Sequence, residues 1–180
     1  MKKIIPLATL LALTFLPISS QAANIFTAYS PDFKDGDNLV KSNEFNSFGC
    51  NGKNIAPEIR WKHAPAEAKS FAITAYDPDA PTGSGWWHFV AYNISIKEKN
   101  LDANKIKGGV ALVNNDGGTK GFMGPCPPVG HGKHHYIFTV YALNVEKLDL
   151  PENASPALVG YMINQHKITS ASITGIYERK

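Results

Sequence analysis

From residue 76 to residue 88 the chain reads YDPDAPTGSGWWH, which joins two apolar runs. Two prolines keep this segment out of a helix and remove two backbone donors from it. The runs on either side, Ser70 to Tyr76 and His88 to Ile94, alternate or are continuously apolar, as β-strands are. We therefore expect two strands joined by a loop, with Asp77 directly at the end of the first strand.

The same arrangement recurs further along the chain. A Gly- and Pro-rich loop, Gly117 to Gly132, precedes another strand-like run, Tyr136 to Leu143. Two more such runs extend from Glu58 to His63 and from Ser170 to Tyr177. Short strands with long connections predict a mainly β protein with an antiparallel core and peripheral helices.

One α-helix is well signalled near the end of the sequence. Ser155 is a suitable N-cap, and Pro156 suits the first helical position. Residues at spacings near one turn follow, and their apolar members should face the sheet: Leu158, Tyr161, Met162 and Gln165. A second helix is expected near Asp102 to Ile106, where little periodicity supports it.

The first 22 residues have the layout of a secretory signal peptide. Lys2 and Lys3 precede an apolar run, Ile4 to Ile18, and a small, polar stretch follows. The run is shorter than the roughly 20 residues of a membrane-spanning helix, and prolines interrupt it. We expect cleavage after Ala22, no stable membrane anchor, and one domain over residues 23–180 in the periplasm or outside the cell.

The charge balance argues against a polyanionic partner. Without Lys2 and Lys3, 16 of the 18 Lys and Arg residues remain, against 15 Asp and Glu residues, so the net charge is +1. This balance gives no support to nucleic-acid binding.

The two cysteines, Cys50 and Cys126, both lie in the exported part, where an oxidising compartment favours pairing. We predict a disulfide between them. Closing a loop of about 77 residues would stabilise the fold by roughly 4 to 5 kcal/mol in the chain-entropy model. Two buried thiols are the alternative.

The residues able to do chemistry cluster beside two predicted strands. His88 and His134 each follow a loop rich in Gly and Pro, so they converge at one sheet end if their strands are neighbours. Asp77 can join them there. In the proline-rich part of the second loop only Gly124 and Cys126 keep backbone donors, and fixed donors beside imidazoles suit an anion. The alternatives are an aspartate that accepts hydrogen bonds within its turn and histidines that belong to the core.

At these two loops the chain resembles the phosphatidylethanolamine-binding protein family, which includes the Raf kinase inhibitor proteins and their bacterial relatives. The first motif is Asp77-Pro78-Asp79-Ala80-Pro81 with Trp86 and His88, and the second runs from Gly124 to Pro128 and ends in His134 and Tyr136. The likeness covers almost all of residues 23–180. It implies a β-sandwich with a few peripheral α-helices and, as is common among bacterial relatives, a homodimer.

The resemblance also implies a small surface cavity that accepts phosphate, phosphoethanolamine, acetate or a similar anion. By this carry-over, Asp77, His88 and His134 line the cavity. Its walls are then Ala80, Pro81, Trp86, Gly124, Cys126, Pro127 and Tyr136.

Three positions depart from the family pattern. His135 stands where relatives usually have an arginine, so a titratable group replaces a permanent cation. Phe122 lacks the hydroxyl often found at its position, and Cys126 replaces the glycine of many relatives. A bridge from Cys126 to Cys50 would fasten this loop to residues 47–54.

These residues favour a binding protein that needs no cofactor or metal, with any regulation exerted through a protein partner. A hydrolase is the second hypothesis, with His88 or His134 as general base and Asp77 as its orienting partner, but no Gly-x-Ser-x-Gly motif is present. A zinc enzyme could use the same side chains, yet the His-Glu-x-x-His spacing is missing. The third hypothesis, which the relatives suggest, is a secreted inhibitor of a protease or of a host signalling protein.

Overall fold

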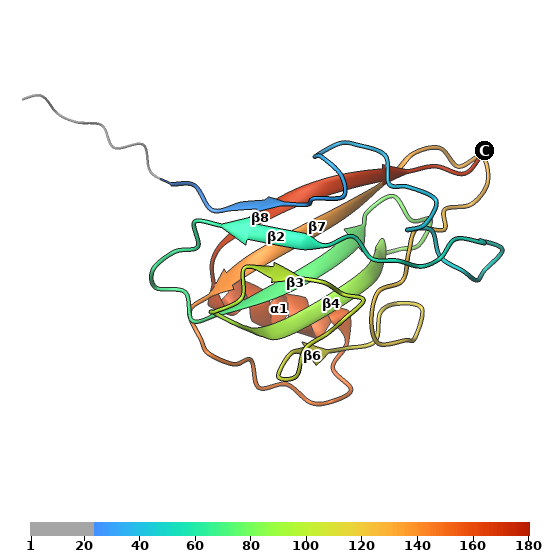
Figure 1. The fold of residues 1–180 in the computed structure, drawn as a ribbon. Coiled ribbons are helices and arrows are strands. Elements are labelled where there is room, and N and C mark those ends of the chain that lie inside the picture. The colour runs from blue at the N-terminus through green and yellow to red at the C-terminus, as the bar shows by residue number, and fades with distance from the viewer. Residues whose placement is uncertain (1–23) are drawn as a thin grey trace, which may run out of the picture.

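The computed structural model describes residues 24–180, so the predicted signal peptide of residues 1–22 lies outside the described residues. Two antiparallel sheets and one α-helix form the regular structure of the described part (Figure 1). In spatial order, the smaller sheet contains β1 (Thr27–Tyr29), β2 (Ile59–Lys62) and β5 (Asn100–Leu101). The larger sheet contains β6 (Ala111–Leu112), β4 (Trp86–Ser95), β3 (Ser70–Asp77), β7 (His134–Leu143) and β8 (Lys167–Tyr177). The predicted mainly β fold is confirmed.

The larger sheet is covered on both faces. Phe71 of β3 packs toward the smaller sheet, and the ring centroid of Trp61 in β2 lies 5.0 Å from its own. The next residue, Ala72, points the other way, as strand geometry requires, and belongs to a second apolar cluster with Val159 and Ile163 of α1 (Pro156–His166). The molecule therefore has three layers, in the order small sheet, large sheet and helix.

Strand pairing brings three chain segments to one end of the large sheet. β3 pairs antiparallel with β4 on one side and with β7 on the other. Asp77, the last residue of β3, lies opposite Trp86, the first residue of β4. Because β4 and β7 both run antiparallel to β3, the end of β3 and the beginnings of β4 and β7 lie at the same end of the sheet. The strands that carry His88 and His134 are thus not direct neighbours, but they flank β3.

The predicted helix is present, although a different face of it is buried. The Ser155 side chain accepts a hydrogen bond from the amide of Leu158 at 3.2 Å, as an N-cap does. Val159 and Ile163, four residues apart, lie on the sheet. Of the apolar side chains expected to face the sheet, Leu158 and Tyr161 are 38% and 59% exposed, so the expectation is wrong for these two, whereas Met162 packs against the second apolar cluster.

The helix expected near residues 102–106 is absent, and α1 is the one helix of residues 24–180, rather than one of several. Side chains turn the backbone here. Asp102 accepts a hydrogen bond from the amide of Asn104 at 2.9 Å, and the Asn104 side chain bonds both main-chain groups of Ala56 at 2.9 and 2.8 Å. Asp and Asn favour such turns over helix because their side chains compete for backbone partners.

Three strands escaped prediction, since β1, β5 and β6 have only two or three residues each. So short a segment carries no readable alternation. Within the part of the chain that the structure describes, α1 is neither long nor apolar enough to cross a membrane.

Candidate functional site

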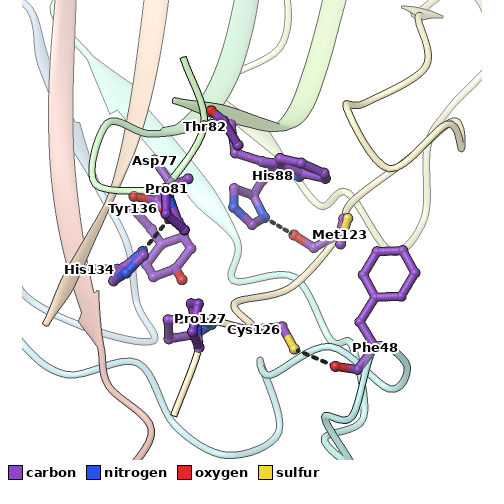
Figure 2. Close-up of a pocket in the computed structure, with 13 residues that line it drawn as sticks. Phe48, Asp77, Pro81, Thr82, His88, Met123, Cys126, Pro127, His134 and Tyr136 are labelled. Carbon is purple, nitrogen blue, oxygen red and sulfur yellow. Dashed lines mark hydrogen bonds and ion pairs between the residues drawn. The ribbon is translucent and has the colours of Figure 1, made fainter. Parts of the chain in front are cut away.

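A cavity of about 190 Å³ opens where β3 ends and where β4 and β7 begin (Figure 2). Its walls come from four separate stretches of chain. The residues that line it are Phe48, Asp77, Ala80, Pro81, Thr82, Trp86, His88, Met123, Cys126, Pro127, Pro128, His134 and Tyr136. All the site residues expected from the sequence are among them except Gly124.

A buried pair joins two of the three strands that meet at the cavity. Nδ1 of His134 lies 2.7 Å from Oδ2 of Asp77, and the two side chains are 2% and 3% exposed. The carboxylate can only accept, so His134 donates from Nδ1. The other oxygen of Asp77 accepts from the amide of Asp79 at 2.8 Å. Asp77 thus fixes its own turn and the imidazole of His134 together, which combines the two roles weighed for it from the sequence.

His131 adds a third member to this pair. Its Nδ1 lies 2.7 Å from Nε2 of His134, and its side chain is exposed. Either His131 donates to a neutral His134, or a protonated His134 donates to His131. A chain of hydrogen bonds therefore runs from the buried Asp77 through His134 to the surface.

His88 is buried with a defined tautomer. Its Nδ1 lies 2.7 Å from the carbonyl oxygen of Met123, which can only accept, so Nδ1 carries the proton (Figure 2). Burial lowers the pKa of His88 to about 4, against the opposing effect of the Met123 hydrogen bond. At neutral pH His88 is therefore uncharged, and Nε2, which has no partner among the described residues, is a hydrogen-bond acceptor.

Two aromatic residues complete the wall around His88. The ring of Tyr136 meets that of His88 edge-on, with centroids 5.0 Å apart. Burial raises the pKa of Tyr136 well above its usual range, so its hydroxyl stays a donor. The indole nitrogen of Trp86 is buried and has no hydrogen-bond partner in residues 24–180.

The loop that leads into β7, residues 122–133, is called the pocket loop below. Gly124 lies in it but does not line the cavity, because its amide donates to the Asn54 side chain at 2.7 Å. A Cβ at this position would lie 2.0 Å from the carbonyl oxygen of Asn43. Gly124 is thus a packing residue, whereas the amide of Cys126 has no acceptor among the described residues.

The predicted disulfide between Cys50 and Cys126 is present, and it joins residues 76 positions apart. It fastens the pocket loop to the segment that carries Phe48. Phe48 lines the cavity although it is 66% exposed, and its φ of 56° is unusual for a residue with a side chain. An apolar ring therefore stands at the mouth of the cavity.

The histidine at position 135 is paired with the carboxylate of Asp79. Its Nδ1 and its amide lie 2.7 and 2.8 Å from Oδ2 of Asp79. Burial raises the pKa of Asp79, but these two hydrogen bonds lower it more, so the pKa lies below its usual value. The pair is partly exposed, so it fixes the position of the loop more than it adds stability.

Sequence reasoning missed several residues of the site. Thr82 and Met123 directly follow or precede predicted positions, so their place could have been inferred. Phe48 could have been inferred from the predicted disulfide, which brings residues 47–54 to the pocket loop. His131 has no such signal, because it lies between two glycines in a segment without periodicity. In residues 24–180 no three His, Cys, Asp or Glu side chains are grouped so that they could hold a metal ion.

The fold and the site define a two-sheet β protein with a small cavity at one end of its larger sheet. The chain belongs to the phosphatidylethanolamine-binding protein family, because the model of that family matches residues 29–178.

Known relatives agree with this assignment. The UPF0098 protein YbcL of Escherichia coli strain K12 is 46% identical over 175 residues, which cover 93% of this chain and 95% of YbcL. LppC of Mycobacterium tuberculosis strain H37Rv, which bears a lipoprotein name, is 36% identical over 157 residues, which cover 87% of this chain and 74% of LppC. A crystal structure of Escherichia coli YbcL, described as a new member of the mammalian PEBP family, matches 86% of this chain and 99% of its own, with 47% identity and a TM-score of 0.83.

Proposed function

We propose that the chain is an exported binding protein for a small anion whose phosphate-type or carboxylate group lies between His88 and His134. The observation that carries this proposal is that Asp77, His88 and His134 meet at one cavity from three strands. A volume of about 190 Å³ is below that of most drug-sized sites, so the ligand is small.

The lining supports a ligand with a charged head and an apolar side. The polar side chains of the lining that belong to strands lie at one end of the large sheet: Asp77, His88 and His134. The residues contributed by the loops are mainly apolar, among them Phe48 and Pro127. In an otherwise apolar cavity, a small number of polar groups is enough to fix the orientation of a ligand.

The protonation of His88 determines which form of the ligand is bound. A neutral His88 offers the lone pair of Nε2, which would repel a bare anionic oxygen. The ligand must therefore either donate a hydrogen bond to Nε2, as a P–OH or an ammonium group does, or cause His88 to take up a proton. In both cases the bound state holds one more proton than a fully deprotonated anion and a neutral imidazole.

Binding is favoured over hydrolysis by the surroundings of the histidines. Among the described residues, no hydroxyl or thiol donates to His88 or His134. The Thr82 hydroxyl donates instead to the carbonyl of Gly85, and Cys126 is held in the disulfide. Within residues 24–180 there is therefore no nucleophile within reach of a general base, which covalent hydrolysis requires.

Export is the part of the proposal that rests on the sequence. The layout of residues 1–22 is typical of a signal peptide. The disulfide between Cys50 and Cys126 suits an oxidising compartment, and the relative LppC bears a lipoprotein name.

Thermal unfolding in phosphate-free buffer tests the proposal. Phosphate or phosphoethanolamine at about ten times its Kd should stabilise the protein by about 1.4 kcal/mol, which raises Tm by roughly 4 °C for a chain of this size. His88→Ala should abolish the rise. His166→Ala, which removes a histidine at the end of α1 away from the cavity, is the matched control and should keep it. A wild-type Tm that does not respond to high millimolar ligand would overturn the proposal.

A further inference from the structure

Arg179, just beyond the end of β8, contacts both segments that the disulfide joins. Its Nη2 donates to the carbonyl of Gly49 at 2.7 Å, and its Nη1 donates to the carbonyl of Pro127 at 3.2 Å. Nη1 also lies 3.7 Å from the sulfur of Cys126. In the main chain, the Arg179 carbonyl accepts from the amide of Gly130 at 2.9 Å. The side chain and the backbone of one residue thus hold the pocket loop at two places.

These contacts leave the charge of Arg179 unneutralised. A guanidinium remains protonated at every physiological pH, and the partners of Arg179 are two carbonyls and a sulfur. No carboxylate of residues 24–180 forms an ion pair with it. A permanent positive charge therefore lies against Cys126 and Pro127, two residues that line the cavity.

As far as the structure describes the chain, the lining of the cavity carries no permanent cation of its own. Among the described residues, neither lysine nor arginine is part of its lining. His88 is neutral, His134 is paired with the carboxylate of Asp77, and His135 is paired with Asp79. Without an outside charge the polar edge of the cavity would be neutral or negative, which does not attract an anion.

We propose that Arg179 is a positioning residue of the anion site, which fixes the Cys126–Pro127 wall and supplies the positive potential behind it. This inference rests on the proposed anion binding. Both properties of arginine are used, because its planar fork bonds carbonyls from two segments while it carries its charge. Figure 1 shows the end of the chain, beyond β8, next to the loop that leads into β7, which agrees with the Gly130 contact.

Three variants separate the two roles. Arg179→Gln removes the charge and most of the fork, while Arg179→Lys keeps the charge and loses the fork. Lys180→Gln removes the same charge one residue further on, where the side chain is exposed and has no hydrogen bond within the described residues, so it is the matched control. Calorimetric titration with inorganic phosphate at about 20 mM and about 200 mM sodium chloride gives the affinity and its salt dependence.

We expect Arg179→Gln to weaken phosphate binding about tenfold at low salt and to flatten the salt dependence, because a nearby charge acts strongly only where screening is weak. Arg179→Lys should lose about threefold and keep the wild-type salt dependence. Lys180→Gln should match the wild type. Urea unfolding and near-ultraviolet circular dichroism establish that each variant is folded before titration.

The outcomes separate this inference from the proposed function. Wild-type protein that fails to bind phosphate overturns both. If the wild type binds and Arg179→Gln retains its affinity and salt dependence, only the role of Arg179 is overturned. Equal losses in Arg179→Lys and Arg179→Gln, with unchanged salt dependence, would overturn the electrostatic role, because a purely structural residue lowers affinity without altering its response to salt.

Discussion

The Nδ1 atom of His134 lies 2.7 Å from Oδ2 of Asp77, and both side chains are buried. Asp77 is the last residue of β3 and His134 is the first residue of β7. Because β3 and β7 are hydrogen-bonded neighbours in the large sheet, the sheet itself sets the position of this pair. The polar edge of the cavity therefore inherits the rigidity of the large sheet, whereas its apolar walls belong to loops.

Asp77→Asn should destabilise the protein by about 2 kcal/mol, because His134 loses a charged acceptor in a buried place. Urea unfolding measures the change in the free energy of unfolding. Asp79→Asn is the control, since its pair with His135 is partly exposed, and it should cost less than about 1 kcal/mol. Equal costs for the two variants would contradict the special role of the buried pair.

Anion affinity should rise as the pH falls, because an anion raises the pKa of His88 from its value of about 4 in the free protein. With sulfate, whose charge is constant over this range, affinity should rise by up to about tenfold per pH unit as the pH falls toward about 4, below which His88 of the free protein is protonated as well. Calorimetry in two buffers of different ionisation enthalpy counts the protons taken up. In His88→Gln the pH dependence should be much weaker, and an unchanged slope would show that another group takes up the proton.

The stability of the free protein should fall as the pH falls, whereas its anion affinity rises, and both changes depend on His88. Burial lowers the pKa of His88 in the folded state, so the unfolded chain binds the proton more readily. The corresponding stability is complete above about pH 6.5 and is lost as the pH falls toward about 4. His88→Gln should remove this part of the pH dependence in urea unfolding.

Phe48 should favour ligands that carry an apolar group beside the anion. Phenyl phosphate should bind about tenfold more tightly than inorganic phosphate to the wild type, because its ring can stack on Phe48. In Phe48→Ala this preference should fall to about twofold. Val129→Ala is the matched control, since Val129 is similarly exposed at 63% but does not line the cavity. If the preference were lost in Val129→Ala and kept in Phe48→Ala, the apolar contact would not be made by Phe48.

Glu44 should make the stability of the protein sensitive to acid. Burial raises the pKa of this carboxyl, but hydrogen bonds from Lys41, Tyr177 and the amide of Asn51 lower it more, to about 2. A lowered pKa gives stability that is present above about pH 4.5 and is lost as the pH falls through about 2, to a total of about 3 kcal/mol. Acid unfolding of Glu44→Gln should show less pH dependence in this window. The exposed Glu152→Gln should behave as the wild type does.

The parts of the site that could be predicted are those attached to strands. Asp77, His88 and His134 flank apolar runs, and antiparallel pairing then brings them to one edge. Loops gave less information. The turn around Asn104 depends on Ala56, about 50 residues away in the chain. The packing role of Gly124 depends on Asn43 and Asn54, about 70 to 80 residues away. No local pattern encodes such distant partners. His131 and Arg179 belong to the same class, because they act through contacts formed only in the folded chain.

The two halves of the buried pair are 57 residues apart in the chain, and their strands meet only through long-range pairing. Long-range pairings form slowly, because a loop must close before they can contribute. The cavity is absent from the denatured chain, and we expect it to be completed only after the transition state for folding. An occupant of the cavity would therefore slow unfolding while leaving the folding rate nearly unchanged, so that only the unfolding arm of a chevron plot shifts.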